Sequence, residues 1–261
     1  MKNLFEKVDS FYLLDIKNPT HPSTFIEEAT YDILILTLPH RIGSSLTMES
    51  YAFVFDEESY YYFDKDKAEF VNFETMQRVY EFLNEKTNNV MKMVATMHES
   101  IDLMEEKLYD NARFTNFMHY WLSNKKDLSR INRILNLGVD VLNTFITTYL
   151  KEEDFLSIHF KDIYEHISRT NRSALLAIDK LNNHYNFYTS SNNEKMNRTI
   201  YLLTILSGIF LPLHFVAGYF GMNTQGLPFN EVSYGTGLVT LIMVSCAMIM
   251  TGVILFLKKR L

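Results

Sequence analysis

The chain is poor in the residues that interrupt helices. Its 261 residues include only five prolines and nine glycines. There is no proline between Pro39 and Pro212, and Gly138 is the only glycine in the 164 residues from 44 to 207. Proline and glycine are the least favourable residues in a helix interior, so their absence predicts long helices. We expect two of these over residues 74–109 and 113–150, with Gly138 as a candidate break in the second.

Cysteine pairs, net positive charge and catalytic motifs are also missing. Cys246 is the only cysteine, so the chain can form no intrachain disulfide. The net charge of −6 argues against a nucleic-acid partner. The sequence has no phosphate-binding loop and no hydrolytic or redox constellation, so we do not expect an enzyme. The segment from Met1 to Leu4 has no apolar core of the kind found in signal peptides, so we expect no cleaved leader.

Charge is absent from two long stretches near the C-terminal end. Thr199–Phe220 and Gly237–Leu257 contain no Asp, Glu, Lys or Arg. About 20 apolar residues suffice for a helix to cross a bilayer core, and neither stretch shows the polar face of a soluble helix. We therefore expect transmembrane helices over residues 197–220 and 237–257, joined by a loop over residues 221–236 and followed by a basic tail over residues 258–261.

The basic residues that flank these stretches predict the orientation. Lys195 and Arg198 precede or begin the first helix, and the tail contains Lys258, Lys259 and Arg260. The intervening loop has no basic residue. Because positive charge is retained on the cytoplasmic side, we expect a multi-pass protein of the cell inner membrane with both termini in the cytoplasm.

The first 73 residues have the composition of a small sheet. Aromatic and β-branched runs separated by turn residues are typical of strands. The runs are Tyr31–Leu38, which ends at Pro39, and Tyr51–Phe55, Tyr60–Phe63 and Phe70–Phe73. We expect a meander within residues 10–73 and, with the helices up to residue 150, a cytoplasmic α/β domain over residues 1–153. Its acidic turn residues are either metal ligands or simply solvated: Asp56, Glu57, Glu58, Asp64 and Asp66.

A long stalk helix is predicted from residue 154 into the first apolar stretch. Its apolar residues recur at intervals of seven, at Phe160, Ile167, Ala174, Leu181 and Tyr188. A helix over residues 154–220, which includes the stalk at 154–196, would be about 100 Å long. Such a rod needs the preceding helices and partner subunits to cover it. The same stripe also fits a three-helix bundle within one chain.

The first apolar helix has a seam of small and polar residues at heptad spacing. We interpret it as the lining of a pore, made of Asn197, Ile200, Leu203, Thr204, Ser207, Leu211, His214 and Gly218. Small residues also serve simply as close helix-packing contacts. An ionisable group at membrane depth usually faces a cavity or a partner, so His214 is the sharpest indication of a pathway. Its alternative interpretation is a neutral imidazole that is hydrogen-bonded within the helix bundle.

The end of this helix resembles a known family signature. The segments Phe210–Leu213 and Phe215–Asn223, which ends in Gly221, Met222 and Asn223, resemble the first membrane helix of the CorA family. That family comprises magnesium and other divalent-cation channels and includes the ZntB zinc transporters. The resemblance implies an α+β membrane protein with a cytoplasmic α/β domain, a stalk helix that continues into the first of two transmembrane helices, and a homopentamer in the lipid bilayer.

The resemblance also implies a function. Gly221, Met222 and Asn223 would form a selectivity loop for a hydrated divalent ion, and the channel would pass Mg²⁺ passively down the membrane potential. Asp162 and Asp179 of the stalk would bind the same ion inside the cell and regulate opening. His214 stands where many members of the family carry a threonine, and the segment Thr224–Pro228 is as similar to the zinc-transporter branch as to the magnesium branch. Zn²⁺ or Co²⁺ transport, proton-coupled in the zinc case, and a non-conducting membrane-anchored interaction protein therefore remain alternatives.

Overall fold

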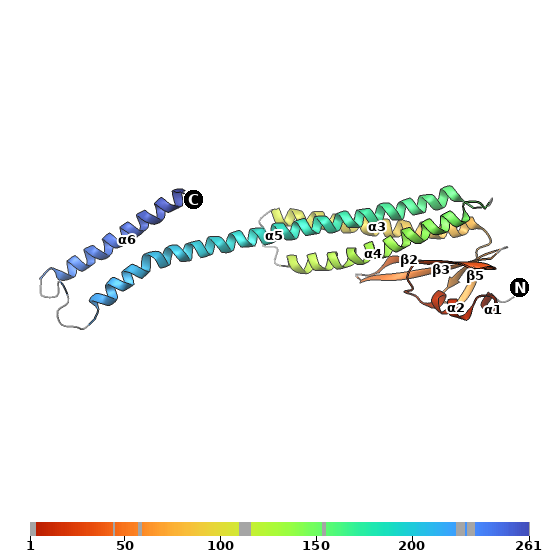
Figure 1. Ribbon diagram of the computed structural model, residues 1–261, viewed down its shortest axis with the longest axis horizontal. Helices are drawn as coiled ribbons and strands as arrows, with labels where there is room; N and C mark the ends of the chain where they lie inside the picture. The colour runs from red at the N-terminus through yellow and green to blue at the C-terminus, as the bar shows by residue number, and fades with distance from the viewer. Residues whose placement is uncertain are drawn as a thin grey trace. The chain divides into compact units, whose positions relative to one another are not determined.

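The computed structural model describes residues 4–43, 45–56, 59–109, 116–152, 155–222, 228 and 233–260. The chain divides into two compact units, Met1–Asn186 and Phe187–Leu261. Figure 1 shows its helices and strands. In chain order they are α1 (Leu4–Lys7), α2 (Ser10–Lys17), β1 (Thr24–Glu27), β2 (Tyr31–Ile42), β3 (Ser45–Asp56), β4 (Tyr60–Asp64), β5 (Glu69–Asn72), α3 (Met76–Tyr109), α4 (Phe117–Tyr149), α5 (Ser157–Phe220) and α6 (Gly235–Arg260).

The sheet is an antiparallel meander in the order β1-β2-β3-β4-β5. The meander is as predicted, but β1 is not among the four runs that the sequence indicates. The prediction that Pro39 ends the second strand is wrong, because β2 continues to Ile42 and Pro39 pairs with Met48 of β3. Strand β1 pairs with β2 only as far as Ile35. Pro39 therefore lies where β2 has one neighbour, a position at which the missing N–H of proline is tolerated.

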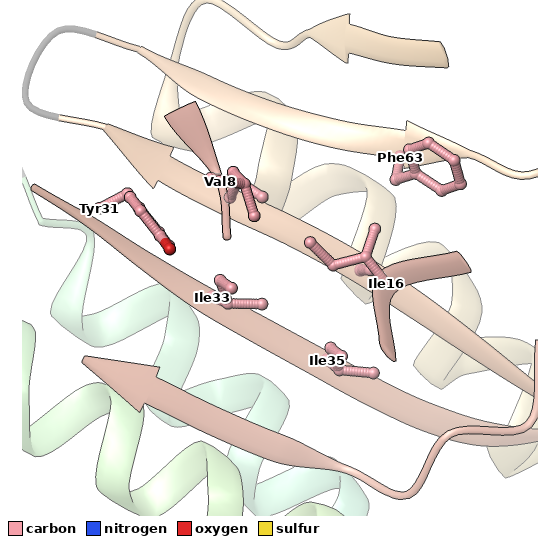
Figure 2. Packing of buried hydrophobic residues seen from close by; sticks show 8 residues of the cluster. Val8, Ile16, Tyr31, Ile33, Ile35 and Phe63 are labelled. Carbon is pink, nitrogen blue, oxygen red and sulfur yellow. The ribbon is translucent and has the colours of Figure 1, made fainter. Parts of the chain in front are cut away.

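Two short helices, α1 and α2, occupy the start of the region predicted to hold strands. The side chain of Asp9 accepts a hydrogen bond of 2.8 Å from the Phe11 backbone N–H, so it caps α2. The buried side chains Val8 and Ile16 reach the outer face of the sheet. Figure 2 shows them gathered there with Ile33 and Phe63. The prediction of strands from residue 10 is wrong over Ser10–Lys17. This segment is helical because Asp9 caps its start and because the sheet, formed by residues distant in sequence, offers an apolar surface for Ile16.

The opposite face of the sheet is covered by α3 and α4. Alternate residues of a strand point to opposite faces. Leu34 and Leu36 of β2 are therefore buried on the helix side, whereas Ile33 and Ile35 are buried on the α1/α2 side. Because both faces are covered, the strand is a continuous apolar run rather than an alternating one.

Helices α3, α4 and the first part of α5 pack on one another along regularly spaced buried residues. On α3 these include Val79, Leu83, Val90, Val94, Met97, Ile101 and Met104. The heptad residues Phe160, Ile167, Ala174 and Leu181 of α5 are also buried in the single chain. The stripe is thus covered by helices of the same protomer, and it does not by itself require a partner subunit. Helix α4 runs unbroken through Gly138.

The second unit contains the last part of α5 and all of α6. Helix α5 is one continuous helix of 64 residues with Pro212 inside it. The fold class is therefore as predicted: an N-terminal antiparallel sheet domain, a long helix that continues into an apolar segment, and a second apolar helix near the C-terminal end.

Candidate functional site

Two helices of the described residues are long and apolar enough to cross a membrane. The most apolar windows of α5 and of α6 (Gly235–Val253) each have a mean hydropathy of 2.0, and no part of either window is buried within the chain. A soluble core helix of this composition would be covered by other elements. Apolar helices that no part of their own chain covers need another apolar environment, which lipid or further subunits supply.

The eight residues predicted to line a pore all lie on the apolar part of α5. Each is exposed in the single chain, and at heptad spacing they share one side of the helix. The Thr204 hydroxyl donates a hydrogen bond of 2.9 Å to the Ile200 carbonyl oxygen and is satisfied within the helix. This side of α5 is thus available to a lumen, to lipid or to another subunit.

His214 makes a hydrogen bond that defines its neutral tautomer. Its Nδ1 lies 3.1 Å from the Phe210 carbonyl oxygen. Since a carbonyl only accepts, Nδ1 carries the proton, and Nε2 of the neutral ring keeps a free lone pair. This bond is made to the backbone of the same helix, so Nδ1 needs no partner from another helix. Nε2 remains chemically able to accept a proton or to bind a metal ion.

The predicted selectivity loop begins directly after α5. The Gly221 N–H donates a hydrogen bond of 2.9 Å to the Ala217 carbonyl oxygen, and the Met222 side chain is exposed. A Cβ atom on Gly221 would lie 2.8 Å from that same oxygen, which is closer than any side chain tolerates. Glycine is required here by a close backbone approach, a reason that sequence reasoning missed. Asn223 lies outside the described residues.

The two predicted regulatory carboxylates lie on α5 in the first unit. Asp162 Oδ1 is 3.5 Å from His166 Nε2, and Asp179 is exposed. Among the residues that the structure describes, no three His, Cys, Asp or Glu side chains are arranged to hold a metal ion. Asp162 and His166, four residues apart on one face of α5, would supply only two ligands, so a metal site there needs further ligands, for example from another copy of the chain.

Asp56, one of the acidic turn residues, lines a cavity of about 560 Å³ together with Glu28, Asp32 and Glu152. Two of its carboxylates are already used within the fold. Asp32 Oδ2 accepts a hydrogen bond of 2.6 Å from the Tyr149 hydroxyl, and Asp56 forms an ion pair with Lys7. Burial raises the pKa of Tyr149, which keeps this phenol protonated and able to donate. These contacts favour a structural role. The neighbouring Glu57 and Glu58 lie outside the described residues.

A charged contact between α3 and α5 was not anticipated. Lys180 Nζ lies 2.7 Å from Asp102 Oδ1 and also pairs with Glu105, rather than with its sequence neighbour Asp179. The lysine lowers the pKa of both carboxyls, and the two carboxylates raise the pKa of Lys180. No local signal could have indicated these partners, because they lie on a different helix.

These features define a class: a protein with an antiparallel sheet domain, a helical bundle and two apolar helices, the first of which ends in a tight glycine turn. A family model described as "CorA-like Mg2+ transporter protein" matches residues 74–259. The chain belongs to this family, and it is a membrane protein. The family is one of transporters, in agreement with the expectation that the chain is not an enzyme.

Individual relatives agree with this assignment. The chain is 24% identical over 184 residues to the cobalt/magnesium transport protein CorA of Thermotoga maritima, covering 70% of this chain and 51% of that protein. It is 24% identical over 167 residues to the divalent cation transporter CmaX of Pseudomonas aeruginosa, covering 63% and 50%. It is 40% identical over 55 residues to the zinc transport protein ZntB of Photorhabdus laumondii, covering 21% and 17%. The first two matches thus span about half the length of these relatives.

A solved structure shares the fold over nearly the whole chain. The CorA magnesium transporter of Methanocaldococcus jannaschii superposes with a TM-score of 0.79, with 19% sequence identity, covering 96% of this chain and 84% of that one. The full-length CmaX protein superposes with a TM-score of 0.70 and 16% identity, covering 96% and 82%. At these identities the likeness concerns the fold alone.

Proposed function

We propose that the chain is the subunit of a homopentameric channel that conducts divalent cations across the cell inner membrane, with Mg²⁺ as the favoured ion. The observation that carries this proposal is the family match over residues 74–259, which includes both apolar helices. The 184-residue match to the cobalt/magnesium transport protein of Thermotoga maritima supports the choice of ion. Co²⁺ is expected to pass by the same route.

In this proposal the seam of α5 faces a central axis. Five copies of Asn223 offer neutral amide oxygens at the outer mouth, where a hydrated Mg²⁺ binds through its own water molecules. The close packing of Gly221 on Ala217 fixes where the loop leaves the helix. An inside-negative potential drives the ion inward by about 4.6 kcal/mol per 100 mV for a divalent charge, so no other energy source is needed.

The narrow part of the proposed pore is apolar. Rings of Leu211, and of Ile200 or Leu203 nearer the inside, would close the path by expelling water. Asp162 and Asp179 are proposed to bind the transported ion between subunits and to hold the pore shut when the ion is abundant inside. The lack of a complete metal cluster within one described chain is compatible with a site shared between copies.

A zinc transporter is the second candidate, and two observations favour it. The 55-residue match to a zinc transport protein has a higher identity than the longer matches. His214 also keeps a free Nε2 lone pair, which suits Zn²⁺ or a proton better than it suits Mg²⁺. Zinc uptake would then be coupled to an inward proton gradient through this side chain.

Ion flux into liposomes tests the proposal. The purified chain is reconstituted with a Mg²⁺-sensitive dye inside, and Mg²⁺, Co²⁺ and Zn²⁺ are added outside under an inside-negative potential. We expect Mg²⁺ entry that falls at least tenfold in Asn223→Ala, because the outer ring of amide oxygens is lost. Asn143→Ala, which removes an exposed amide of α4 away from the proposed pore, is the matched control and should conduct normally.

The remaining outcomes separate the alternatives. Zn²⁺ entry that rises with an inward proton gradient and disappears in His214→Ala, but not in His159→Ala, would establish the zinc transporter and refute the magnesium channel. Absence of flux for all three ions in correctly inserted protein would contradict both and leave a membrane-anchored interaction protein.

A further inference from the structure

His184 is the last buried residue of α5, and it is an unusual one. Its exposed fraction is 5%, and neither of its ring nitrogens has a hydrogen-bond partner among the residues that the structure describes. A buried polar group without a partner is costly, so an apolar residue would stabilise this position better. The residues beyond His184 on α5 are all at least partly exposed. The packing of α5 in the first unit therefore ends on a titratable side chain.

Charged residues of α3 and α5 surround this imidazole. His184 Nε2 is 3.6 Å from Glu105 Oε2, and Lys180 occupies both Glu105 and Asp102. His98, one turn before Asp102 on α3, is directed to α5 at Ser173, where its Nε2 lies 2.8 Å from the Ser173 hydroxyl oxygen. Two carboxylates are thus already shared with one ammonium group when His184 is neutral.

Helix α4 places a lysine and a tryptophan next to the layer formed by His184, Lys180, Asp102 and Glu105. Lys125 Nζ donates a hydrogen bond of 2.8 Å to Asn182 Oδ1, two residues before His184. Trp121 stacks on Tyr185 at 4.7 Å and donates from Nε1 to the Leu181 carbonyl oxygen at 2.9 Å. Trp121 is the only tryptophan of the chain. Its fluorescence therefore reports on the packing of this layer alone.

Protonation of His184 has an unfavourable consequence here. The imidazolium would be a second buried cation beside Lys180, with Glu105 already engaged. Burial lowers the pKa of His184 below its usual value, and this outweighs the attraction of Glu105. The pKa of His184 is lower in the packed state than in the unpacked state. The packed state is therefore fully stable above the ordinary histidine pKa, and its stability decreases as the pH falls below that value.

We propose that the layer of His184, Glu105, Asp102 and Lys180 is an acid-sensitive latch, which holds the last part of α3 against α5 at neutral pH and releases it when the cytoplasmic side is acidified. The geometry supports this because the imidazole is enclosed, unpaired and within reach of a carboxylate that it shares with a competing cation. The latch concerns packing within one chain, so its test does not depend on ion conduction.

The first measurement is Trp121 fluorescence of the full chain in detergent, titrated from about pH 7.5 to about pH 5. We expect the emission to shift to longer wavelength as the layer opens, with a midpoint below the ordinary histidine pKa. His184→Gln, which keeps the size and polarity but cannot be protonated, should lose the shift. His159→Gln removes an exposed histidine of the same helix and should retain it.

Hydrogen exchange of backbone amides provides the second measurement and locates the response. After correction for intrinsic exchange rates, protection of residues 98–109 of α3 should fall about tenfold on acidification, while residues 79–94 change little. Glu105→Gln removes the attraction that favours a protonated His184, so the loss of protection should begin at a higher pH. The double variant with His184→Gln should show no acid response. Unchanged protection in the wild type, or an acid response that persists in His184→Gln, would overturn the proposal.

Discussion

At the scale of single residues, Gly221 and Gly138 differ in how much space each leaves for a side chain. Gly221 leaves no room for a side chain, because its Cβ would meet the Ala217 carbonyl oxygen. Gly138 is buried in α4 opposite the sheet, and a Cβ there would lie 3.4 Å from Leu36 Cδ1, an ordinary van der Waals contact. Backbone geometry requires the first glycine, whereas the second leaves room for a methyl group in ordinary contact with Leu36.

This difference predicts the effect of two substitutions at Gly138. Gly138→Ala should raise the thermal unfolding midpoint by about 2–4 °C, because alanine stabilises a helix interior by up to about 1 kcal/mol relative to glycine. Gly138→Leu should lower it, because overpacking against Leu36 costs about 1–3 kcal/mol. Thermal unfolding in detergent, followed by circular dichroism, measures both. A lower midpoint for alanine would show that Leu36 cannot adjust.

At the scale of elements, the sheet and the helices meet at an aromatic layer around Phe145 of α4. Phe145 is fully buried, and its ring lies 5.5 Å from that of Phe25 on β1, 5.3 Å from that of Phe55 on β3 and 5.4 Å from that of Phe160 on α5. One side chain thus connects α4 to three elements that are far from it or from one another in sequence. Such rings stabilise through burial and through edge-to-face contacts.

We therefore expect Phe145→Ala to destabilise the first unit by about 3–5 kcal/mol, since it removes a large side chain that four elements share. Leu137→Ala, at a partly exposed position of the same helix, should change the stability by less than about 0.5 kcal/mol. Denaturant unfolding measures both. Equal effects of the two substitutions would contradict the central position of Phe145.

At the scale of the whole molecule, the proposed topology places the two ends of the first apolar helix on opposite sides of the membrane. The lone Cys246 can be replaced by alanine, so single cysteines can then be introduced at exposed positions. Ser190, in the first part of α5 beyond the bundle, and Ser233, just before α6, are suitable.

Labelling of intact cells with an impermeant maleimide should modify Ser233→Cys but not Ser190→Cys, which should react only after the cells are permeabilised. The physical reason is the retention of the basic flanks, Lys195 and Arg198, on the cytoplasmic side. If both cysteines react from the same side, α5 does not cross the membrane, and the proposed pore is excluded.

Several features follow from the sequence alone because they depend on length, composition or local spacing. The two uncharged stretches predict the apolar helices, and the alternation of aromatic runs and turns predicts the meander. The glycine after Phe220 predicts the end of α5. Each of these signals lies within a short segment, so it can be interpreted without knowing what packs against it.

Other features depend on the tertiary structure because they pair residues that are distant in sequence. The heptad stripe from Phe160 specifies that one face of α5 is buried, but only packing shows that helices of the same chain bury it. Lys180 pairs with carboxylates about 75 residues away rather than with its neighbour Asp179, and α1 and α2 form where the sheet offers an apolar face. A periodic pattern in the sequence determines which side chains are buried, because periodicity is local. The fold determines which residues they pack against, because those partners are distant in sequence.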